Sequence, residues 1–272
     1  MVTDFVFDGQ TLSGFGYMIA SFNGANDETA EVSMLDFTDI SSPLSDVSNK
    51  VATSYPNNYT ATIQIMKSPD CNGNEDDDYH LTYDDISTIS KWLCRKEYKW
   101  FKWIDDDDDD DAYFEVHCKV GKVITAGTCY GLELTFESNR PFAVSSEKVT
   151  TTTLSNANGS FTVEMYSDEE GWIYPDIELT LAQGGTLNVS NSQEAGRVST
   201  IKNCTSGEKI TFHGDVLQAS STVVSHVLAT DYNYVFPRLY NEYGSYTNVI
   251  TVNLPCSVTL KYRGIRKVGL GI

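Results

Sequence analysis

Acidic side chains are the residues of this sequence that could most readily do chemistry, because two paired carboxylates supply the acid and the base of glycoside hydrolysis. Two acidic groups have suitable spacing, Asp168-Glu169-Glu170 and Asp176 with Glu178. A chain with 38 acidic residues is expected to contain such pairs from its composition alone. We therefore predict no catalytic residues and no enzyme activity, with a glycoside hydrolase as the least favoured alternative.

The histidines and cysteines lack the spacing of metal ligands, since the chain contains no HExxH frame and no CxxC pair. The four histidines are His80, His117, His213 and His226. The six cysteines are Cys71, Cys94, Cys118, Cys129, Cys204 and Cys256. Neither a GxSxG elbow nor a Walker motif occurs. We predict ordinary polar histidines, free and mostly buried thiols, and neither a metal nor a cofactor.

An unbroken run of aspartates, Asp105 to Asp111, could attract a hard cation, which prefers carboxylate oxygens. The run lacks the alternating spacing and the turn glycine of an EF-hand loop. The shorter patch Glu75 to Asp78 lacks them as well. We predict that both segments are solvated acidic loops, and the sequence indicates no function for the longer one.

The formal net charge of −19 and the isoelectric point near 4.4 predict a surface that repels phosphate backbones. Direct binding of nucleic acid is therefore not expected, although acidic walls would suit a channel through which DNA slides without sticking. No run approaches the roughly 18 apolar residues of a membrane span, and Met1 does not open a signal sequence. We expect no membrane association.

The first half of the chain alternates apolar and polar residues with the period of two that is typical of half-buried strands. The clearest predicted strands are 31–37, 59–66, 98–104, 112–116, 122–126 and 130–137. The polar segment Asp39 to Asn58 is predicted to be a long loop or an extended arm. One helix is predicted at about 85–96, with Asp84 or Asp85 as its N-cap and an apolar stripe toward the sheet.

Short strands at the spacing of a β-sandwich follow from Ser160 onward, and one of them is predicted at Tyr232 to Phe236. We therefore predict a mainly β protein with two sandwich-like domains. The first, residues 1–141, is a β-domain with one helix and a hairpin or arm. An extended connector, residues 142–159, leads to a second β-sandwich, residues 160–272.

Three motifs mark the last third of the chain. They are Ile173-Tyr174-Pro175-Asp176-Ile177-Glu178-Leu179, Asp231-Tyr232-Asn233-Tyr234-Val235-Phe236-Pro237-Arg238-Leu239 and Tyr262-Arg263-Gly264-Ile265-Arg266-Lys267-Val268-Gly269. The first half adds Phe5-Val6-Phe7-Asp8-Gly9, the helix end Trp92-Leu93 and Arg140-Pro141. In order and spacing these motifs resemble siphophage distal tail proteins, the tail-tip hub family of phages that infect Gram-positive hosts.

The resemblance implies a structural virion protein at the tail tip, assembled in the host cytoplasm. Its first domain would close into a homo-hexameric ring, and its second would be galectin-like. The ring would join the tail-tube protein to a tail-associated tip or lysin protein, with DNA passing through its lumen, and would nucleate tail assembly. Ring closure by rotation requires two different complementary surfaces on each subunit.

Two groups of residues are candidates for binding. Trp172, Tyr174 and Tyr240 are aromatics that could stack on a sugar. They support the alternative of a carbohydrate-binding module for host cell-wall attachment, and a receptor-binding protein is a further partner to consider.

Basic residues near the C-terminal end could instead contact an acidic neighbour or pack across a terminal strand. The candidate interface residues are Arg238, Arg263, Arg266 and Lys267.

Overall fold

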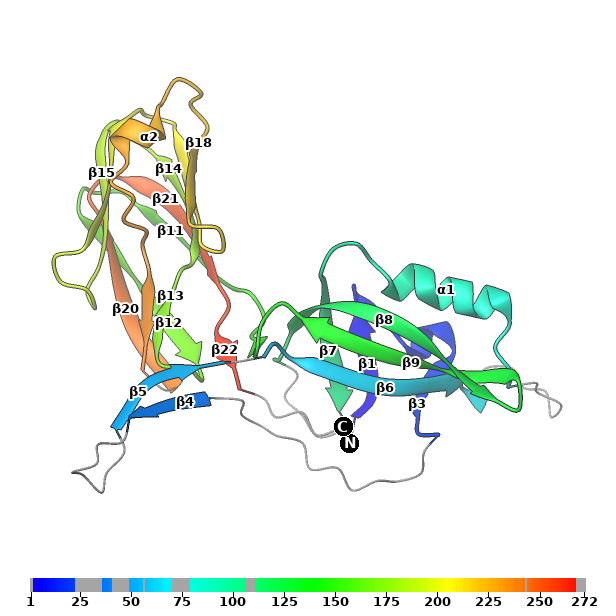
Figure 1. Cartoon of the computed structure of the whole chain (residues 1–272). Coiled ribbons are helices and arrows are strands. Elements are labelled where there is room, and N and C mark those ends of the chain that lie inside the picture. The colour runs from blue at the N-terminus through cyan, green and yellow to red at the C-terminus, as the bar shows by residue number, and fades with distance from the viewer. Residues whose placement is uncertain are drawn as a thin grey trace. The chain divides into compact units, whose positions relative to one another are not determined.

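The computed structural model describes residues 2–22, 36–40, 49–55, 57–69, 79–105, 111–242 and 244–267. Two compact units divide the chain: Met1–Val144 with Lys267–Ile272, and Ser145–Arg266 (Figure 1). Each unit is built mainly of β-strands around its own hydrophobic core, so the predicted fold class is confirmed. The patch Glu75 to Asp78, most of the aspartate run and Cys71 lie outside the described residues.

The first unit contains a seven-stranded antiparallel sheet with the order β2-β1-β7-β8-β9-β6-β3. Its strands are β1 (Val2–Phe7), β2 (Gln10–Thr11), β3 (Tyr17–Ala20), β6 (Thr60–Lys67), β7 (Lys99–Asp105), β8 (Phe114–Thr125) and β9 (Thr128–Ser138). The predicted strands 112–116 and 122–126 form one long strand, β8. It meets β9 at Ala126 and Gly127, whose φ angles of 52° and 85° suit a tight hairpin turn.

Three further elements belong to this unit: the 3-10 helix Ser13–Phe15 (η1), the strand β10 (Ala143–Val144) and a two-stranded ribbon. The ribbon pairs β4 (Asp36–Ile40) with β5 (Asn49–Ser54). The segment Asp39 to Asn58, predicted as a loop or arm, therefore contains a strand. Of the strand predicted at 31–37, residues 31–35 lie outside the described part of the chain.

The helix α1 (Tyr83–Leu93) begins two residues earlier and ends three residues earlier than the predicted range of about 85–96, and Thr82 rather than Asp84 or Asp85 is its N-cap. The Thr82 hydroxyl accepts from the Asp85 backbone N–H at 3.2 Å, and the Asp85 carboxylate accepts from the Thr82 N–H at 2.8 Å. This reciprocal capping box satisfies two backbone donors. At the other end, the Trp92 indole N–H donates to the Phe7 carbonyl at 3.1 Å, which ties the helix to β1.

The second unit is a β-sandwich of a five-stranded sheet, β11-β21-β14-β17-β18, and a four-stranded sheet, β12-β20-β15-β16. The first sheet comprises β11 (Lys148–Leu154), β14 (Asp176–Leu181), β17 (Lys209–His213), β18 (Gln218–Ser221) and β21 (Cys256–Tyr262). The second comprises β12 (Gly159–Ser167), β15 (Gly185–Asn191), β16 (Val198–Cys204) and β20 (Gly244–Val252). Because β11 pairs with β21, the range 142–159, predicted as a connector, contains a strand of this sandwich.

Shorter elements complete the second unit: β13 (Gly171–Ile173), α2 (Leu228–Asp231), β19 (Leu239–Asn241) and β22 (Ile265–Arg266). The strand predicted at Tyr232 to Phe236 is wrong. The chain there follows α2 and makes an isolated bridge from Tyr232 to Ile201 of the sandwich, without forming a strand. Tyr234 has a left-handed φ of 57° that an extended strand cannot contain.

Gly264 lies against the backbone of β12 and has no room for a side chain. A Cβ atom at this position would lie 1.9 Å from the Tyr166 carbonyl oxygen. Because that atom belongs to a paired strand, Gly264→Ala is expected to destabilise the second unit by about 3 kcal/mol, the upper end for overpacking. Urea unfolding measures the loss. The control is Gly121→Ala, where the new Cβ meets its nearest neighbour at 3.6 Å. Equal unfolding midpoints for the two variants would contradict the prediction.

Candidate functional site

An aromatic–arginine cluster, made of Trp172, Arg238, Tyr240 and Tyr246, lies on the second unit. β13 and β19 pair antiparallel with Trp172 opposite Tyr240, and the two ring centroids are 4.9 Å apart. Tyr246 on β20 meets Tyr240 edge-on at 5.3 Å. The Arg238 guanidinium lies 4.1 Å from the Trp172 ring centroid, so it covers one face of the indole. Large half-buried side chains of these types are typical of binding hot spots.

Buried asparagines hold the backbone that carries the cluster. The Asn248 amide donates to the Tyr240 carbonyl at 2.9 Å and accepts from the Tyr240 N–H at 2.9 Å. The Asn191 amide donates to the Arg238 carbonyl and to the Asn248 side chain, both at 2.8 Å. Both asparagines are at least nine-tenths buried, so their hydrogen bonds fix the short strand β19 strongly. Nothing in the local sequence around either asparagine indicates this role.

Carboxylates surround the cluster and pair with its polar ends. Glu194 forms ion pairs with Arg238 and, at 3.1 Å, with Arg197. The hydrogen bond to Glu194 raises the pKa of Arg238, and Tyr174 contributes to the same shift. Burial, followed by the hydrogen bond that the Tyr240 hydroxyl donates to Glu170 at 3.2 Å, raises the pKa of Tyr240. The cluster therefore combines one cation, Arg238, with aromatic rings, and the carboxylates of Glu194 and Glu170 pair with its polar ends.

Arg238→Ala is expected to lower the free energy of unfolding of the second unit by about 2 kcal/mol, because it removes a charged hydrogen bond and a cation over an aromatic ring. Urea unfolding measures this loss. Arg238→Lys keeps the charge but not the planar fork, so it should restore less than half of the stability. If Arg238→Ala unfolded at the wild-type urea concentration, the cluster would have no energetic role.

The structure brings four of the predicted binding residues together: Trp172, Tyr174, Arg238 and Tyr240. The other basic candidates are bound within the chain. Arg263 donates to the Ser145 carbonyl at 2.9 Å. Arg266 lies 3.6 Å from the Asp168 carboxylate and over the Tyr166 ring. Lys267 belongs to the first unit, and it too interacts with other residues of the chain.

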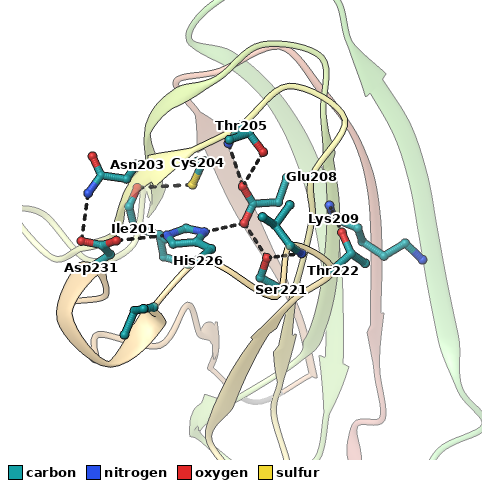
Figure 2. A network of polar contacts seen from close by, with 12 residues as sticks. Ile201, Asn203, Cys204, Thr205, Glu208, Lys209, Ser221, Thr222, His226 and Asp231 are labelled. Carbon is teal, nitrogen blue, oxygen red and sulfur yellow. Dashed lines mark hydrogen bonds and ion pairs between the residues drawn. The ribbon is translucent and has the colours of Figure 1, made fainter.

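A buried polar network lies at the end of the second unit where β16, β17 and α2 meet (Figure 2). Its centre is Glu208, whose side chain is completely buried, and His226, whose side chain is 3% exposed. The Glu208 carboxylate contacts His226 Nδ1 at 2.5 Å and accepts from the Ser221 hydroxyl at 2.5 Å. It also accepts from the Thr205 backbone N–H at 2.7 Å.

The hydrogen bonds in this network show which groups accept, and they lower the pKa of its carboxylate. Burial alone would raise the pKa of Glu208, but the hydrogen bonds from His226, Ser221 and Thr205 outweigh burial and lower it. The carboxylate is therefore ionised and accepts from Nδ1. His226 Nε2 lies 2.8 Å from the Lys202 carbonyl, which can only accept. Both ring nitrogens of His226 therefore face oxygen acceptors, the Glu208 carboxylate at Nδ1 and the Lys202 carbonyl at Nε2.

The predicted free thiols are found among the described cysteines: Cys118, Cys204 and Cys256 are buried, Cys129 is half-buried and Cys94 is exposed. Cys204 adjoins the network of Glu208. Burial and then the charge of Glu208 raise the pKa of Cys204 to about 11. No sequence pattern connects Cys204, Glu208 and His226, because His226 is 18 residues from Glu208 and only the fold brings them together.

An open apolar cavity of about 210 Å³ lies beside α2. Its wall includes Leu217, Leu228, Tyr232, Tyr234 and Phe236. Several large apolar side chains nearby are solvent-exposed, including Val224 and Val227.

None of the described helices is long and apolar enough to span a bilayer.

Comparisons with known proteins place these features in context. A family model described as a phage tail protein N-terminal domain matches residues 1–140, and a model described as a phage tail C-terminal domain matches residues 142–262. No curated protein sequence matches the chain significantly. Among solved structures, the Dit protein of phage SPP1 matches with a TM-score of 0.61 at 11% identity, over 97% of this chain and 99% of that one. That protein is described as a paradigm of the hub adsorption apparatus in phages that infect Gram-positive bacteria.

Proposed function

The chain belongs to the phage tail protein family that these two models describe, and from this premise we propose that it is a distal tail protein. In this proposal it forms a hexameric ring that joins the tail tube to the tail-tip proteins. The observation that carries it is the shared fold of the Dit hub protein of SPP1, which extends over nearly the full length of both chains. At 11% identity this match shows a likeness of fold that covers both units.

The first unit is proposed to form the ring. Rotational closure requires each subunit to present two different complementary surfaces, and a ring of this kind has two faces for two different partners. One face would bind the tail-tube protein and the other a tail-associated tip or lysin protein. The net charge of −19 suits a lumen that DNA crosses without binding.

The aromatic–arginine cluster is proposed to contact a partner protein of the tail tip rather than a sugar. A sugar ring stacks on an open aromatic face, whereas Arg238 covers one face of Trp172. Tryptophan, tyrosine and arginine are also the residues that contribute most to protein–protein hot spots. Binding of the tip protein should therefore weaken in Arg238→Ala while the ring remains intact.

The acidic groups that suggested a glycoside hydrolase are engaged in structural contacts. Asp168 pairs with Arg266, Asp176 accepts from the Gly214 backbone N–H at 2.7 Å, and Glu178 pairs with Lys209 at 2.6 Å. The hydrogen bond from Lys209 is the main cause that lowers the pKa of Glu178. A general acid needs a raised pKa to keep its proton near neutral pH, so Glu178 is not suited to that role. These contacts support a structural role without catalysis.

Electron microscopy of intact particles tests the proposal. Antibodies against the purified chain, visualised with gold, should label the end of the tail that is distal to the capsid. Pre-adsorption of the antibodies with the purified chain should abolish the label. Label along the whole tube, or on the capsid, would contradict assignment of this chain to the tail tip.

A further inference from the structure

Three buried side chains that can bind a metal converge at one end of the second unit (Figure 2). Cys204 ends β16, Glu208 precedes β17, and His226 lies between β18 and α2. One ligand atom from each of the three lies within 4.8 Å of the others. Cys204 is 5% exposed, and the other two side chains are at most 3% exposed. A thiol, a carboxylate and an imidazole thus meet where water is largely excluded.

The outer atoms of the carboxylate and the imidazole are held by other groups, as in metal sites. The outer oxygen of Glu208 accepts from the Thr205 N–H at 2.7 Å and from its hydroxyl at 3.2 Å. His226 Nε2 donates to the Lys202 carbonyl at 2.8 Å, with the Asp231 carboxylate at 3.5 Å. A metal-binding histidine almost always donates its second N–H to a carbonyl or carboxylate, which fixes the ring and its tautomer. Nδ1 faces the inner oxygen of Glu208, which also accepts from the Ser221 hydroxyl at 2.5 Å.

Metal binding requires these groups as a thiolate, a carboxylate and a neutral imidazole, because metal ligands must be deprotonated. Together with one divalent cation, such a ligand set carries no net charge. The buried site could therefore hold the ion without an uncompensated charge in the interior.

We propose that Cys204, Glu208 and His226 bind one divalent cation of the zinc type. Thiolate and imidazole ligands together favour zinc over magnesium or calcium. Ligand atoms bound to one tetrahedral zinc ion at about 2.0–2.1 Å lie roughly 3.3 Å apart. The 2.5 Å contact between Glu208 and His226 must therefore open by less than 1 Å, which small side-chain rotations supply. The bound ion would cross-link β16, β17 and the segment before α2.

Cobalt is the probe for this site, because a thiolate–cobalt bond gives a near-ultraviolet charge-transfer absorption that carboxylate or imidazole ligation does not. The full chain is reduced, stripped of metal with a chelator and titrated with Co²⁺. We expect saturation at one ion per chain, displacement of the absorption by Zn²⁺, and release of protons on Zn²⁺ binding in weakly buffered dye solution. Absence of the thiolate–cobalt absorption in the wild-type chain at excess Co²⁺ would overturn the proposal.

Matched cysteine variants locate the binding thiol. Cys204→Ser should abolish the charge-transfer absorption and lower the affinity for Zn²⁺ by at least 10-fold. Cys256→Ser, at another buried thiol of the same unit, and Cys94→Ser, at the exposed thiol, should leave both unchanged. An absorption that persists in Cys204→Ser but disappears in Cys94→Ser would assign the ion to the surface thiol and refute the site. If Cys204→Ser does not fold, an absorption that persists in both Cys256→Ser and Cys94→Ser supports the site, and loss of the absorption in either variant refutes it.

Discussion

Phe136→Ala is expected to lower the free energy of unfolding of the first unit by about 3–5 kcal/mol, the usual loss for a buried phenylalanine. Phe136 on β9 is completely buried. Its ring lies 4.5 Å from Phe101 and 5.2 Å from Phe5, by ring centroids. Both neighbours belong to the same core cluster and are at most 1% exposed, so they cannot move far to fill the space left by the removed ring.

Urea unfolding measures the loss, with Tyr130→Ala as the control on the same strand. Tyr130 is 38% exposed, so its removal should change stability by less than about 0.5 kcal/mol. The proposed function adds a second expectation. Phe136→Ala should also fail to form rings, because ring contacts require a folded first unit. Equal stability of the two variants would mean that the aromatic core does not hold the sheet together.

Glu208→Gln is expected to lower the free energy of unfolding of the second unit by about 3–5 kcal/mol in metal-free buffer at neutral pH. The substitution keeps the shape of the side chain but removes the buried carboxylate that His226, Ser221 and Thr205 contact. Glu178→Gln is the control, since Glu178 pairs with a cation but is 41% exposed. Surface ion pairs of that kind contribute about 0.2–1 kcal/mol.

The same variant predicts a pH dependence with a defined sign. The pKa of Glu208 is lower in the folded chain than in the unfolded one. Its contribution to stability is therefore fully present above the unfolded value of about 4.3 and is lost as the pH falls through the folded value. The stability difference between wild type and Glu208→Gln should shrink in acid. A difference that stayed constant from neutral to acidic pH would show that the carboxylate is not ionised in the fold.

The sequence predicted those parts of the fold that follow from local periodicity. Alternation along 59–66 and 130–137 corresponds to β6 and β9, and the apolar stripe to α1. The N-cap was placed wrongly because several acidic residues competed for it, and only the reciprocal bonding of Thr82 with Asp85 decides among them. Tyr232 to Phe236 was misread because apolar alternation does not reveal the left-handed backbone at Tyr234.

The candidate sites depend on contacts between residues far apart in sequence. Trp172, Arg238 and Tyr240 could be selected by residue type, yet their meeting depends on the pairing of β13 with β19. Asn248 gives no local signal, because a buried asparagine and a surface asparagine look alike in sequence. His226 was predicted to be an ordinary polar histidine, whereas the fold buries it against Glu208.

The oligomeric state of the purified chain tests the central claim most directly. Native mass spectrometry combined with negative-stain imaging should show six copies arranged as a ring with a central hole, at high protein concentration or after addition of the tail-tube protein. A chain that remains monomeric under both conditions, or that closes with a symmetry other than six-fold, would contradict the proposed hexameric tail hub.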